Sequence, residues 1–273
     1  MNPPKKISIV APFFNEELAV QHFYETIKET FNSLANYTLE LVCIDDGSTD
    51  GTLSQLVLLA EKDPCVQVIE FSRNFGKEAA LSAGIDFSTG DAVIPIDVDL
   101  QDPPGLIPQM ISLWEQGAEV VLAKRVDRSS DTALKRVTAS LFYRFHNVLS
   151  SEVQLPENVG DFRLMDRLVI DALKRLPERR RFMKGLFAWV GFKTVSIDYV
   201  RASREVGNSK FSGWKLWNFA LEGITSFSLI PLKVWTYVGM VGAIFAFFYA
   251  IFVIIKTLIF GIDLPGYASL LVV

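Results

Sequence analysis

Cysteine and histidine are both scarce in this sequence, with two of each among 273 residues. Cys43 and Cys65 form no C-x-x-C pair, which argues against a disulfide framework, and we interpret both as reduced, structural residues. His22 and His146 have no partner at metal-ligand spacing, so we interpret them as structural or surface residues. Any chemistry in this chain is therefore expected from other side chains.

The sequence also lacks the two common glycine-rich phosphate loops. No G-x-G-x-x-G follows the first predicted strand, and no G-x-x-x-x-G-K-[ST] occurs. The formal net charge of -4 argues against a chain that binds nucleic acid through an overall basic surface. A nucleotide, if one is bound, is expected to be held by carboxylates and a metal ion.

The N-terminus has no apolar stretch long enough for a signal peptide, which predicts that the chain starts in the cytosol. Charge is absent from "VWTYVGMVGAIFAFFYAIFVII", residues 234–255. At about 1.5 Å per residue this stretch spans about 33 Å, the thickness of a hydrocarbon core. Trp235 and Tyr237 lie at one end of it, where an aromatic belt is expected. We predict a transmembrane helix.

A second apolar stretch begins at about residue 266 and ends with the chain, which predicts a second span cut short. Lys and Arg are plentiful before residue 234 and nearly absent from the turn "GIDLPG" between the two stretches. The positive-inside rule therefore predicts a multi-pass protein of the inner or plasma membrane with its N-terminal domain in the cytoplasm.

Residues 5 to about 125 alternate short β-rich runs with amphipathic stretches, which is typical of βαβ units on a mostly parallel sheet. The predicted strands are 7–13, 39–45, 66–71, 92–97 and 119–124, and the predicted helices are 17–35, 52–62, 77–88 and 105–116. The first four strands end in "PFFNEE", "DDGSTDG", "SRNFGK" and "DVDLQDPP". Since open α/β sheets bind ligands beyond the carboxyl ends of their strands, these polar ends predict the site.

Asp97, Asp99 and Asp102 follow the fourth strand within six positions. Residues at i and i+2 of an extended chain point to the same side, and two neighbouring carboxylates repel unless a cation joins them. Asp97 and Asp99 therefore favour Mg²⁺ or Mn²⁺ bridging a diphosphate. Asp102 is equally well explained as the cap of the helix that follows.

The four strand-end motifs, in this order, closely resemble family 2 glycosyltransferases with the GT-A fold. The later "GDFRLMDR" and "SREVGNSKF" are similar to the polyprenyl-phosphate branch of that family, which includes dolichyl-phosphate mannose synthases and bacterial undecaprenyl-phosphate glucosyltransferases. Two positions depart from the family pattern: Val98 stands where alanine is usual, and "AKR" at 123–125 replaces G-x-R. The second change puts the backbone at Ala123 in doubt and retains Arg125.

The resemblance implies a role for matching residues on the donor side. Pro12, Glu16, Asp45 and Asp46 would line the nucleoside pocket, and Asp97 would contact the sugar nucleotide. Asp99, with Gln101, would hold Mg²⁺ or Mn²⁺.

On the acceptor side, the resemblance implies that Arg125, Arg136 and Ser140 meet a lipid phosphate. A segment with Arg204, Ser209 and Lys210 would close over the donor phosphates.

Asp161 of "GDFRLM" has two interpretations: it orients the acceptor, as the resemblance suggests, or it is a structural partner of Arg163 or Arg167. Arg73 and Lys77 either face phosphates or belong to a solvated turn and helix start. The basic run 178–182 is interpreted as a solvated or membrane-surface face.

Two stretches, 135–149 and 213–230, place aromatics and leucines between basic residues, which favours interfacial helices over ordinary packing. We predict three regions: a cytosolic GT-A domain (1–212), a juxtamembrane amphipathic helix (213–232) and a transmembrane region (233–273). A homo-oligomer formed through the membrane helices would be in keeping with the family.

The predicted activity is an inverting transfer of a hexose from a nucleotide diphosphate sugar to a polyprenyl phosphate, with glucose and UDP-glucose favoured. A GDP-mannose-dependent mannose synthase is the first alternative. A processive polysaccharide synthase usually carries Q-x-x-R-W, which does not occur here. A membrane-tethered sensor of sugar nucleotides, without turnover, is the alternative outside catalysis.

Overall fold

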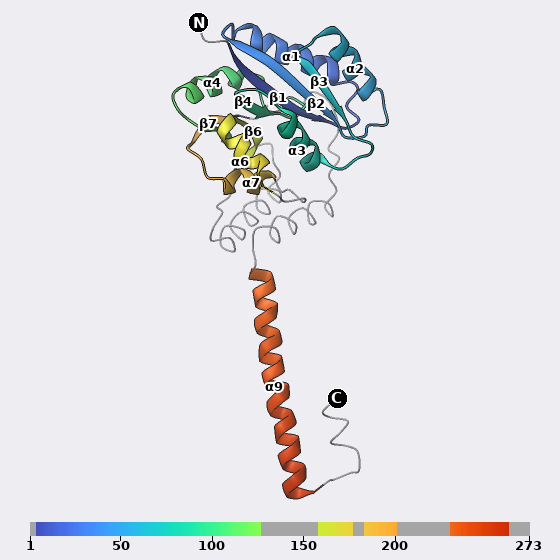
Figure 1. The fold of residues 1–273 in the computed structure, drawn as a ribbon, viewed down its shortest axis with the longest axis vertical. Coiled ribbons are helices and arrows are strands. Elements are labelled where there is room, and N and C mark those ends of the chain that lie inside the picture. The colour runs from blue at the N-terminus through green and yellow to red at the C-terminus, as the bar shows by residue number, and fades with distance from the viewer. Residues whose placement is uncertain (1–3, 127–157, 177–182, 201–229, 262–273) are drawn as a thin grey trace. The chain divides into compact units, whose positions relative to one another are not determined.

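The computed structural model of the protein describes four stretches of the chain, in which the colours of Figure 1 run from blue to red. These are residues 4–126, 158–176, 183–200 and 230–261. They belong to two compact units, one within residues 1–223 and the other within residues 224–273, and each unit is described by itself.

The first unit is built on a seven-stranded sheet with the strand order β3-β2-β1-β4-β6-β5-β7. The strands are β1 Lys5–Phe13, β2 Tyr37–Asp45, β3 Val66–Glu70, β4 Ala92–Pro95, β5 Val120–Arg125, β6 Val159–Asp166 and β7 Thr194–Tyr199. All pairs are parallel except those of β6, which runs antiparallel to both β4 and β5. The predicted mostly parallel α/β sheet is confirmed, and the antiparallel β6 was not foreseen.

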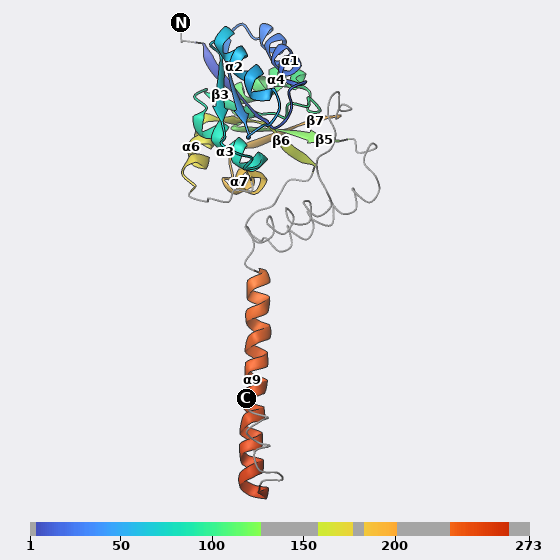
Figure 2. The ribbon, with the colours of Figure 1, turned by 90° about the vertical axis from the view of Figure 1, so that its right-hand side faces the viewer.

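Helices cover both faces of this sheet (Figures 1 and 2). The helices are α1 Val20–Asn32, α2 Thr52–Lys62, α3 Lys77–Phe87, the 3-10 helix η1 Pro104–Leu106, α4 Ile107–Glu115, α6 Arg167–Lys174 and α7 Met183–Trp189. One layer holds α1, α2 and α4, and the other holds α3, α6 and α7. Strands covered on both faces read as continuous apolar runs, which is why the sequence pattern predicted them.

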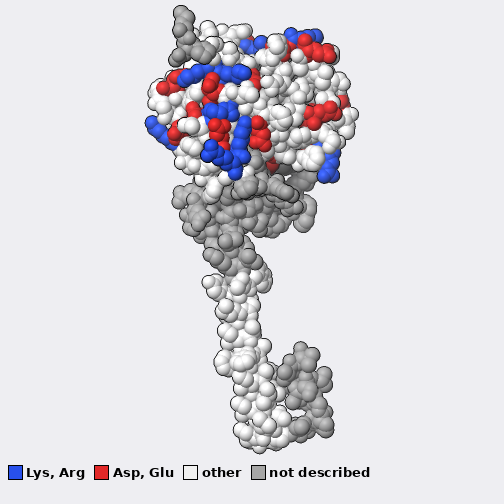
Figure 3. Space-filling model, in the orientation of Figure 1, with Lys and Arg blue, Asp and Glu red and all other residues white. Residues whose placement is uncertain are grey.

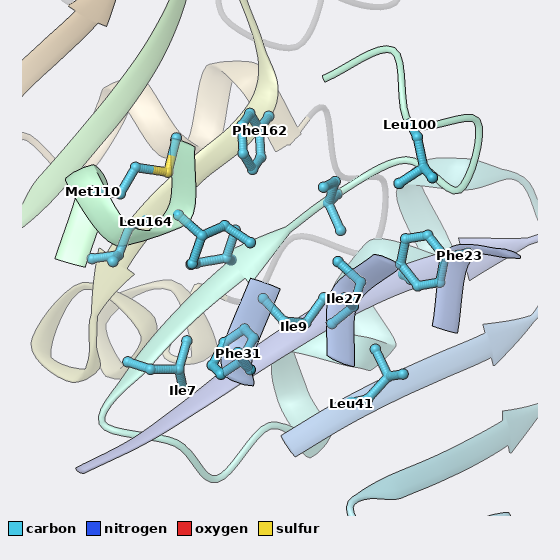
Figure 4. Packing of buried hydrophobic residues seen from close by; sticks show 14 of the residues in the cluster. Ile7, Ile9, Phe23, Ile27, Phe31, Leu41, Leu100, Met110, Phe162 and Leu164 are labelled. Carbon is cyan, nitrogen blue, oxygen red and sulfur yellow. The ribbon is translucent and has the colours of Figure 1, made fainter. Parts of the chain in front are cut away.

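The core on the α1 side follows the two-residue period of β1. Ile7 and Ile9 are fully buried and belong to the same cluster as Phe23 and Ile27 of α1 (Figure 4). Each such side chain contributes about 2 kcal/mol when it leaves water. On the other face, a Cβ at Gly84 of α3 would lie 2.3 Å from Val10 Cγ1, so only glycine lets α3 approach the sheet this closely.

Charged side chains of both signs are interleaved on the face of this unit that Figure 3 shows. The second unit contributes α9, Ile230–Phe260, whose visible face in the same view carries no charged group. Its apolar side chains are exposed, Trp235 at 73% and Phe245 at 73%, which is the pattern of a helix that meets lipid or another apolar surface.

By length and composition, residues Val234–Phe260 of α9 could cross a membrane, and no other helix in the described residues could. The predicted span ended at residue 255, but the helix continues past Lys256 to Phe260. Residues 230–232 of the predicted juxtamembrane helix belong to α9, and the rest of that helix lies outside the described residues. So do the second predicted span from about 266 and the predicted helix 135–149, and the multi-pass arrangement is not supported by the described part of the chain.

Candidate active site

The carboxyl ends of β1, β2 and β4 bring the predicted strand-end motifs to one edge of the sheet. Phe13 at the end of β1 lies in register with Asp45 at the end of β2, and Val10 pairs with Pro95 of β4. Asp97 and Asp99 therefore follow β4 at the edge where Asp45 ends β2. Parallel strands make this convergence possible because all their carboxyl ends point the same way.

The motifs after β1 and β2 are tied together by hydrogen bonds. The Asn15 backbone N–H donates to Ser48 Oγ at 2.9 Å, and Asn15 Oδ1 accepts from the Thr49 N–H at 2.8 Å. The Glu16 N–H donates to Thr52 Oγ1 at 2.9 Å. Glu16 and Pro12 are both half-buried along this edge. Glu16 thus lies on a loop whose shape is fixed by hydrogen bonds to the neighbouring motif, and Pro12 lies in β1 just before that loop.

Asp46 holds the loop that leads into α3. Its Oδ1 accepts from the Phe75 N–H at 2.7 Å, and its Oδ2 accepts from the Gly76 N–H at 2.9 Å. Burial raises the pKa of Asp46 and Asp45 adds to the rise, while these two backbone donors oppose it. Asp46 therefore shapes the predicted nucleoside side through the loop it holds.

Asp45 and Gly47, the two neighbours of Asp46 in the chain, have different surroundings. Asp45 Oδ2 accepts from the Ser48 N–H at 3.1 Å, whereas the buried Oδ1 has no hydrogen-bond partner among the described residues. Gly47 has φ +68, and a Cβ there would lie 2.4 Å from the backbone carbon of Arg73. Only glycine fits at this turn, because the αL conformation and the close backbone approach both exclude a side chain.

Lys77, the first residue of α3, joins two carboxylates that come from different strands. Its Nζ lies 2.7 Å from Asp97 Oδ1, 2.9 Å from Asp97 Oδ2 and 2.7 Å from Asp161 Oδ2. Burial lowers the pKa of Lys77, but Asp161 and Asp97 outweigh it, so the net pKa is raised and the ammonium is retained. Lys77 lies at the predicted helix start, but its ammonium is held by two carboxylates and is not simply solvated; a contact with phosphate stays a prediction.

Asp161 lies on β6, and its side chain is only 12% exposed. Burial raises the pKa of this carboxyl, but Lys77 first, then Lys184 and Arg163, bring it well below its usual range. Its ion pair is with Lys77, a partner that sequence reasoning did not consider. Asp161 Oδ1 is buried and has no hydrogen-bond partner in the described part of the chain.

The two arginines named as alternative partners of Asp161 have other contacts. Arg163 donates to the Gly160 carbonyl at 2.7 Å and lies over the Phe187 ring at 4.3 Å. Arg167 donates to the Gly90 carbonyl at 2.7 Å. Arg163 acts on Asp161 through its charge. An orienting role for Asp161 stays a prediction.

The turn after β4 contains the predicted metal ligands. β4 ends at Pro95, two residues earlier than predicted, so Asp97 and Asp99 lie in a turn and not on an extended strand. Both are half-buried while Val98 between them is buried, and Asp99 Oδ1 accepts from the Gln101 N–H at 3.3 Å. Leu100 has φ 49, which tightens the turn.

The donor set of this turn fits a hard divalent ion. Carboxylates and an amide oxygen are ligands that Mg²⁺ and Mn²⁺ accept. Among the residues that the structure describes, no three His, Cys, Asp or Glu side chains form a group that could hold a metal by themselves. Such a site resembles those in which one or two carboxylates share the ion with substrate phosphates and water.

Asp102 does not cap a helix. The residue before η1 is Pro103 and the residue before α4 is Leu106, and neither start has a side-chain cap. Asp102 is buried and accepts a hydrogen bond from the Tyr199 hydroxyl of β7. This long-range contact outweighs the local capping preference, so Asp102 joins the turn after β4 to the far edge of the sheet.

Arg125 is the last residue of β5 and is half-buried, and its N–H donates to the Asn158 carbonyl at 3.0 Å. The pairing of β5 with β6 shifts register between Leu122 and Lys124. The irregularity falls at Ala123, the position where the sequence departs from the family pattern. The other predicted phosphate-binding residues lie outside the described residues: Arg136, Ser140, Arg204, Ser209 and Lys210.

Glu78 is a site residue that sequence reasoning missed. Its Oε2 accepts from the Met183 N–H at 2.7 Å, which fastens α7 to α3. Burial and the nearby Asp161 raise the pKa of Glu78 to about 7, although Met183, Lys77 and Lys184 lower it. The sequence offered one signal, since Glu78 directly follows Lys77 at the start of a predicted helix.

The mostly parallel sheet, with carboxylates and a lysine gathered at its carboxyl edge, agrees with the resemblance of the sequence motifs to glycosyltransferases. Residues 8–174 match glycosyl transferase family 2, and the chain belongs to that family. It is therefore a glycosyltransferase.

Its relatives include bactoprenol glucosyl transferases. The chain is 57% identical over 267 residues to the prophage bactoprenol glucosyl transferase homolog of Escherichia coli K12, covering 98% of this chain and 87% of that protein. It is 57% identical to the bactoprenol glucosyl transferase of Shigella phage SfV, covering 98% of this chain and 86% of that protein.

Solved structures share the fold at lower identity. Glucosyl-3-phosphoglycerate synthase from Mycobacterium tuberculosis, in complex with Mn²⁺, UDP-glucose and phosphoglyceric acid, has a TM-score of 0.55 and 20% identity, covering 82% of this chain and 79% of that one. A mannosyltransferase from Pyrobaculum calidifontis, in complex with GDP-Man and Mn²⁺, has a TM-score of 0.53 and 21% identity, covering 80% of this chain and 61% of that one. These likenesses support the predicted GT-A fold.

Proposed function

We propose that this glycosyltransferase moves glucose from UDP-glucose to a polyprenyl phosphate at a membrane, with inversion at the sugar carbon. The observation that carries the proposal is the 57% identity to proteins named bactoprenol glucosyl transferases, over nearly the whole chain. The long apolar helix α9 agrees with an acceptor that is held in a lipid bilayer. Membrane association follows from both.

The donor side of the reaction requires positive charge near the leaving diphosphate. Asp99 and Gln101, with Asp97 beside them, are the residues that would hold Mg²⁺ or Mn²⁺, and the ion supplies charge that stabilises the departing nucleotide. Lys77 lies 2.7 Å from Asp97 and supplies an ammonium at the same edge. Asp45 and Asp46, at the end of β2, would face the nucleoside.

The acceptor side requires little acid-base chemistry. A phosphate monoester has a second pKa of about 6, so its oxygen is already a nucleophile near neutral pH. A carboxylate next to it would repel it. Lys77 offsets the charge of Asp161, and Asp161 Oδ1, which has no hydrogen-bond partner among the described residues, would accept from a sugar hydroxyl. We assign Asp161 an orienting role and Arg125 a phosphate contact.

Transfer can be tested with the full chain in detergent or vesicles, undecaprenyl phosphate, Mg²⁺ or Mn²⁺, and labelled UDP-glucose or GDP-mannose. Labelled lipid from UDP-glucose is the expected product. Preference for GDP-mannose would replace the sugar and keep the reaction class. No labelled lipid with either donor would contradict the proposal, and nucleotide binding without turnover would favour a sensor.

The metal assignment is tested by Asp99→Asn in the same assay. Loss of one ligand carboxylate is expected to lower transfer by about 100-fold or more while the melting temperature stays near that of the wild type. Asp198→Asn, the same change at an exposed position on β7, serves as the matched control and should leave transfer unchanged. Normal transfer by the Asp99 variant would show that the ion is held elsewhere.

A further inference from the structure

A single ammonium group lies between the two carboxylates to which the proposed reaction gives different tasks. Lys77 Nζ contacts both oxygens of Asp97, at 2.7 and 2.9 Å, and one oxygen of Asp161, at 2.7 Å. The three side chains are 37%, 31% and 12% exposed, so solvent screens them only in part. The geometry is that of a cation with two partners, one on each side of the site.

The backbone around Lys77 is fixed by the nucleoside side of the site. Gly76 has φ +95, and its N–H donates to Asp46 Oδ2 at 2.9 Å, so the start of α3 is anchored to the end of β2. On the other side, Glu78 holds the Met183 N–H of α7 at 2.7 Å. Lys77 therefore cannot move away from Asp97 by a shift of its own backbone without breaking these bonds.

A divalent ion held by Asp99 and Gln101, beside Asp97, would bring two positive charges near this ammonium. Two like charges that lie close together repel strongly where solvent is partly excluded. When a nucleotide diphosphate is also bound, its negative charge offsets that of the ion and is attracted by the Lys77 ammonium. The electrostatic interaction between Lys77 and the bound group then changes from repulsive to attractive. The metal with its nucleotide is thus favoured over the metal alone.

We propose that Lys77 is a positioning residue that makes binding of the divalent ion depend on binding of the nucleotide. Lys77 acts through Asp97, which it holds, and through the charge that it adds beside the ion. The inference rests on the proposed function for the identity of the site, and deepens it by assigning the order in which the site fills. Asp99 and Gln101 would then hold the ion only while the diphosphate of the nucleotide is bound.

The experiment measures Mn²⁺ binding to the full chain in detergent, by the loss of the free-ion EPR signal, with and without UDP or GDP. For the wild type we expect weak binding of Mn²⁺ alone and a tightening of about 100-fold with the preferred nucleotide, since coupling between two sites is reciprocal. This measurement depends on no variant. Equal Mn²⁺ affinity with and without both nucleotides would overturn the proposal.

Lys77→Gln removes the charge and keeps hydrogen-bond donors for the two carboxylates. We expect it to bind Mn²⁺ alone about tenfold more tightly and to lose about tenfold of the nucleotide-induced tightening. Lys77→Arg retains the charge and should keep the wild-type coupling, and Lys62→Gln on the exposed end of α2 is the matched control. A merely structural role would lower affinity in both Lys77 variants or change neither.

If Lys77→Gln melts like the wild type but leaves both Mn²⁺ affinities unchanged, the assignment to Lys77 is wrong. If it fails to fold, Lys77→Arg and the wild type still decide the coupling. The binding assay contains no lipid and no turnover, so its failure is distinct from failure of the proposed transfer. Transfer with uncoupled Mn²⁺ binding would retain the proposed function and reject this inference.

Discussion

Two carboxylates with buried oxygens, Glu40 and Asp161, lie in the same sheet and differ in how their charge is balanced. Glu40 of β2 is 3% exposed and accepts four hydrogen bonds, from Ser8 Oγ, Gln67 Nε2, and the N–H and hydroxyl of Thr89. Asp161 of β6 is paired with an ammonium and keeps one buried oxygen without a hydrogen-bond partner among the described residues. One carboxylate is saturated by neutral donors, and the other is not.

The difference follows the direction of the strands. Ser8 lies within β1 and Thr89 lies just before β4, so both are away from the carboxyl edge of the sheet. In that region neighbouring segments of the chain supply all four hydrogen-bond donors of Glu40. Burial raises the pKa of Glu40, but the hydrogen bonds from Ser8 and Thr89 outweigh it and bring the pKa below its usual value. Buried polar groups cost free energy unless they are satisfied, so an unsatisfied oxygen at the carboxyl edge indicates a place for a ligand.

The largest expected effect tests the functional side of this comparison. Asp161→Asn removes the charge but keeps the shape, and Lys77 retains Asp97 as its partner. We expect transfer to lipid to fall by about 100-fold or more with a nearly unchanged melting temperature, because an orienting group acts mainly in the transition state. Asp171→Asn, an exposed change on α6, is the matched control. Full transfer activity would place Asp161, like Glu40, among the structural carboxylates.

Glu40→Gln tests the structural side and should affect stability alone. Whichever way the amide is turned, its NH₂ meets an N–H donor, either Thr89 N at 2.8 Å or Gln67 Nε2 at 3.2 Å. We expect the free energy of unfolding to fall by about 2 kcal/mol, which lowers the melting temperature by about 4 to 8 °C.

Transfer per folded molecule should be unchanged in Glu40→Gln, measured well below the melting temperature. Glu70→Gln, an exposed carboxylate at the end of β3, provides the control and should melt like the wild type. A loss of transfer without a loss of stability in the Glu40 variant would break the comparison, because it would extend the functional site through the sheet.

The strands and helices up to Arg125 could be predicted from the sequence because each apolar run ends in a polar turn. α2 was predicted with the bounds that the structure shows, Thr52–Lys62. β6 could not be predicted in this way. Its run contains Asp161 and Arg163, and Arg163 is 4% exposed because Phe187 covers it. When contacts with residues distant in the sequence bury the charged side chains of a strand, its sequence lacks the continuous apolar run by which the other strands were predicted.

The candidate site was predicted in part for the same reason. The strand ends that carry Asp45, Asp46 and Asp97 follow from parallel topology, which the alternation of elements implies. The partnership of Lys77 with Asp97 and Asp161 joins residues up to 84 positions apart, since 161 − 77 = 84, and depends on where β6 enters the sheet. For Asp102 a local contact was predicted that the structure does not show: the sequence suggested a helix cap, whereas Asp102 accepts a hydrogen bond from the distant Tyr199.

The smallest expected effect concerns Glu78. Like Asp161 it lies near Lys77, but like Glu40 it accepts a hydrogen bond from a backbone N–H. Burial and Asp161 raise the pKa of Glu78 to about 7, against Met183, Lys77 and Lys184. A carboxyl with a raised pKa favours the folded state most below its unfolded value of about 4.5, and this contribution is lost as the pH rises to about 7.

Glu78→Gln cannot titrate, so the variant should lack the loss of stability that the wild type shows as the pH rises to about 7. The melting temperature of the variant, relative to the wild type, is expected to rise between pH 5 and pH 7.5, by a modest amount because the side chain is only half-buried and solvent screens it. The amide oxygen still accepts from the Met183 N–H, so α7 keeps its anchor. Glu29→Gln on the exposed face of α1 should show no such trend. A constant difference at all pH values would mean that Glu78, like Glu40, is kept ionised by its hydrogen bonds.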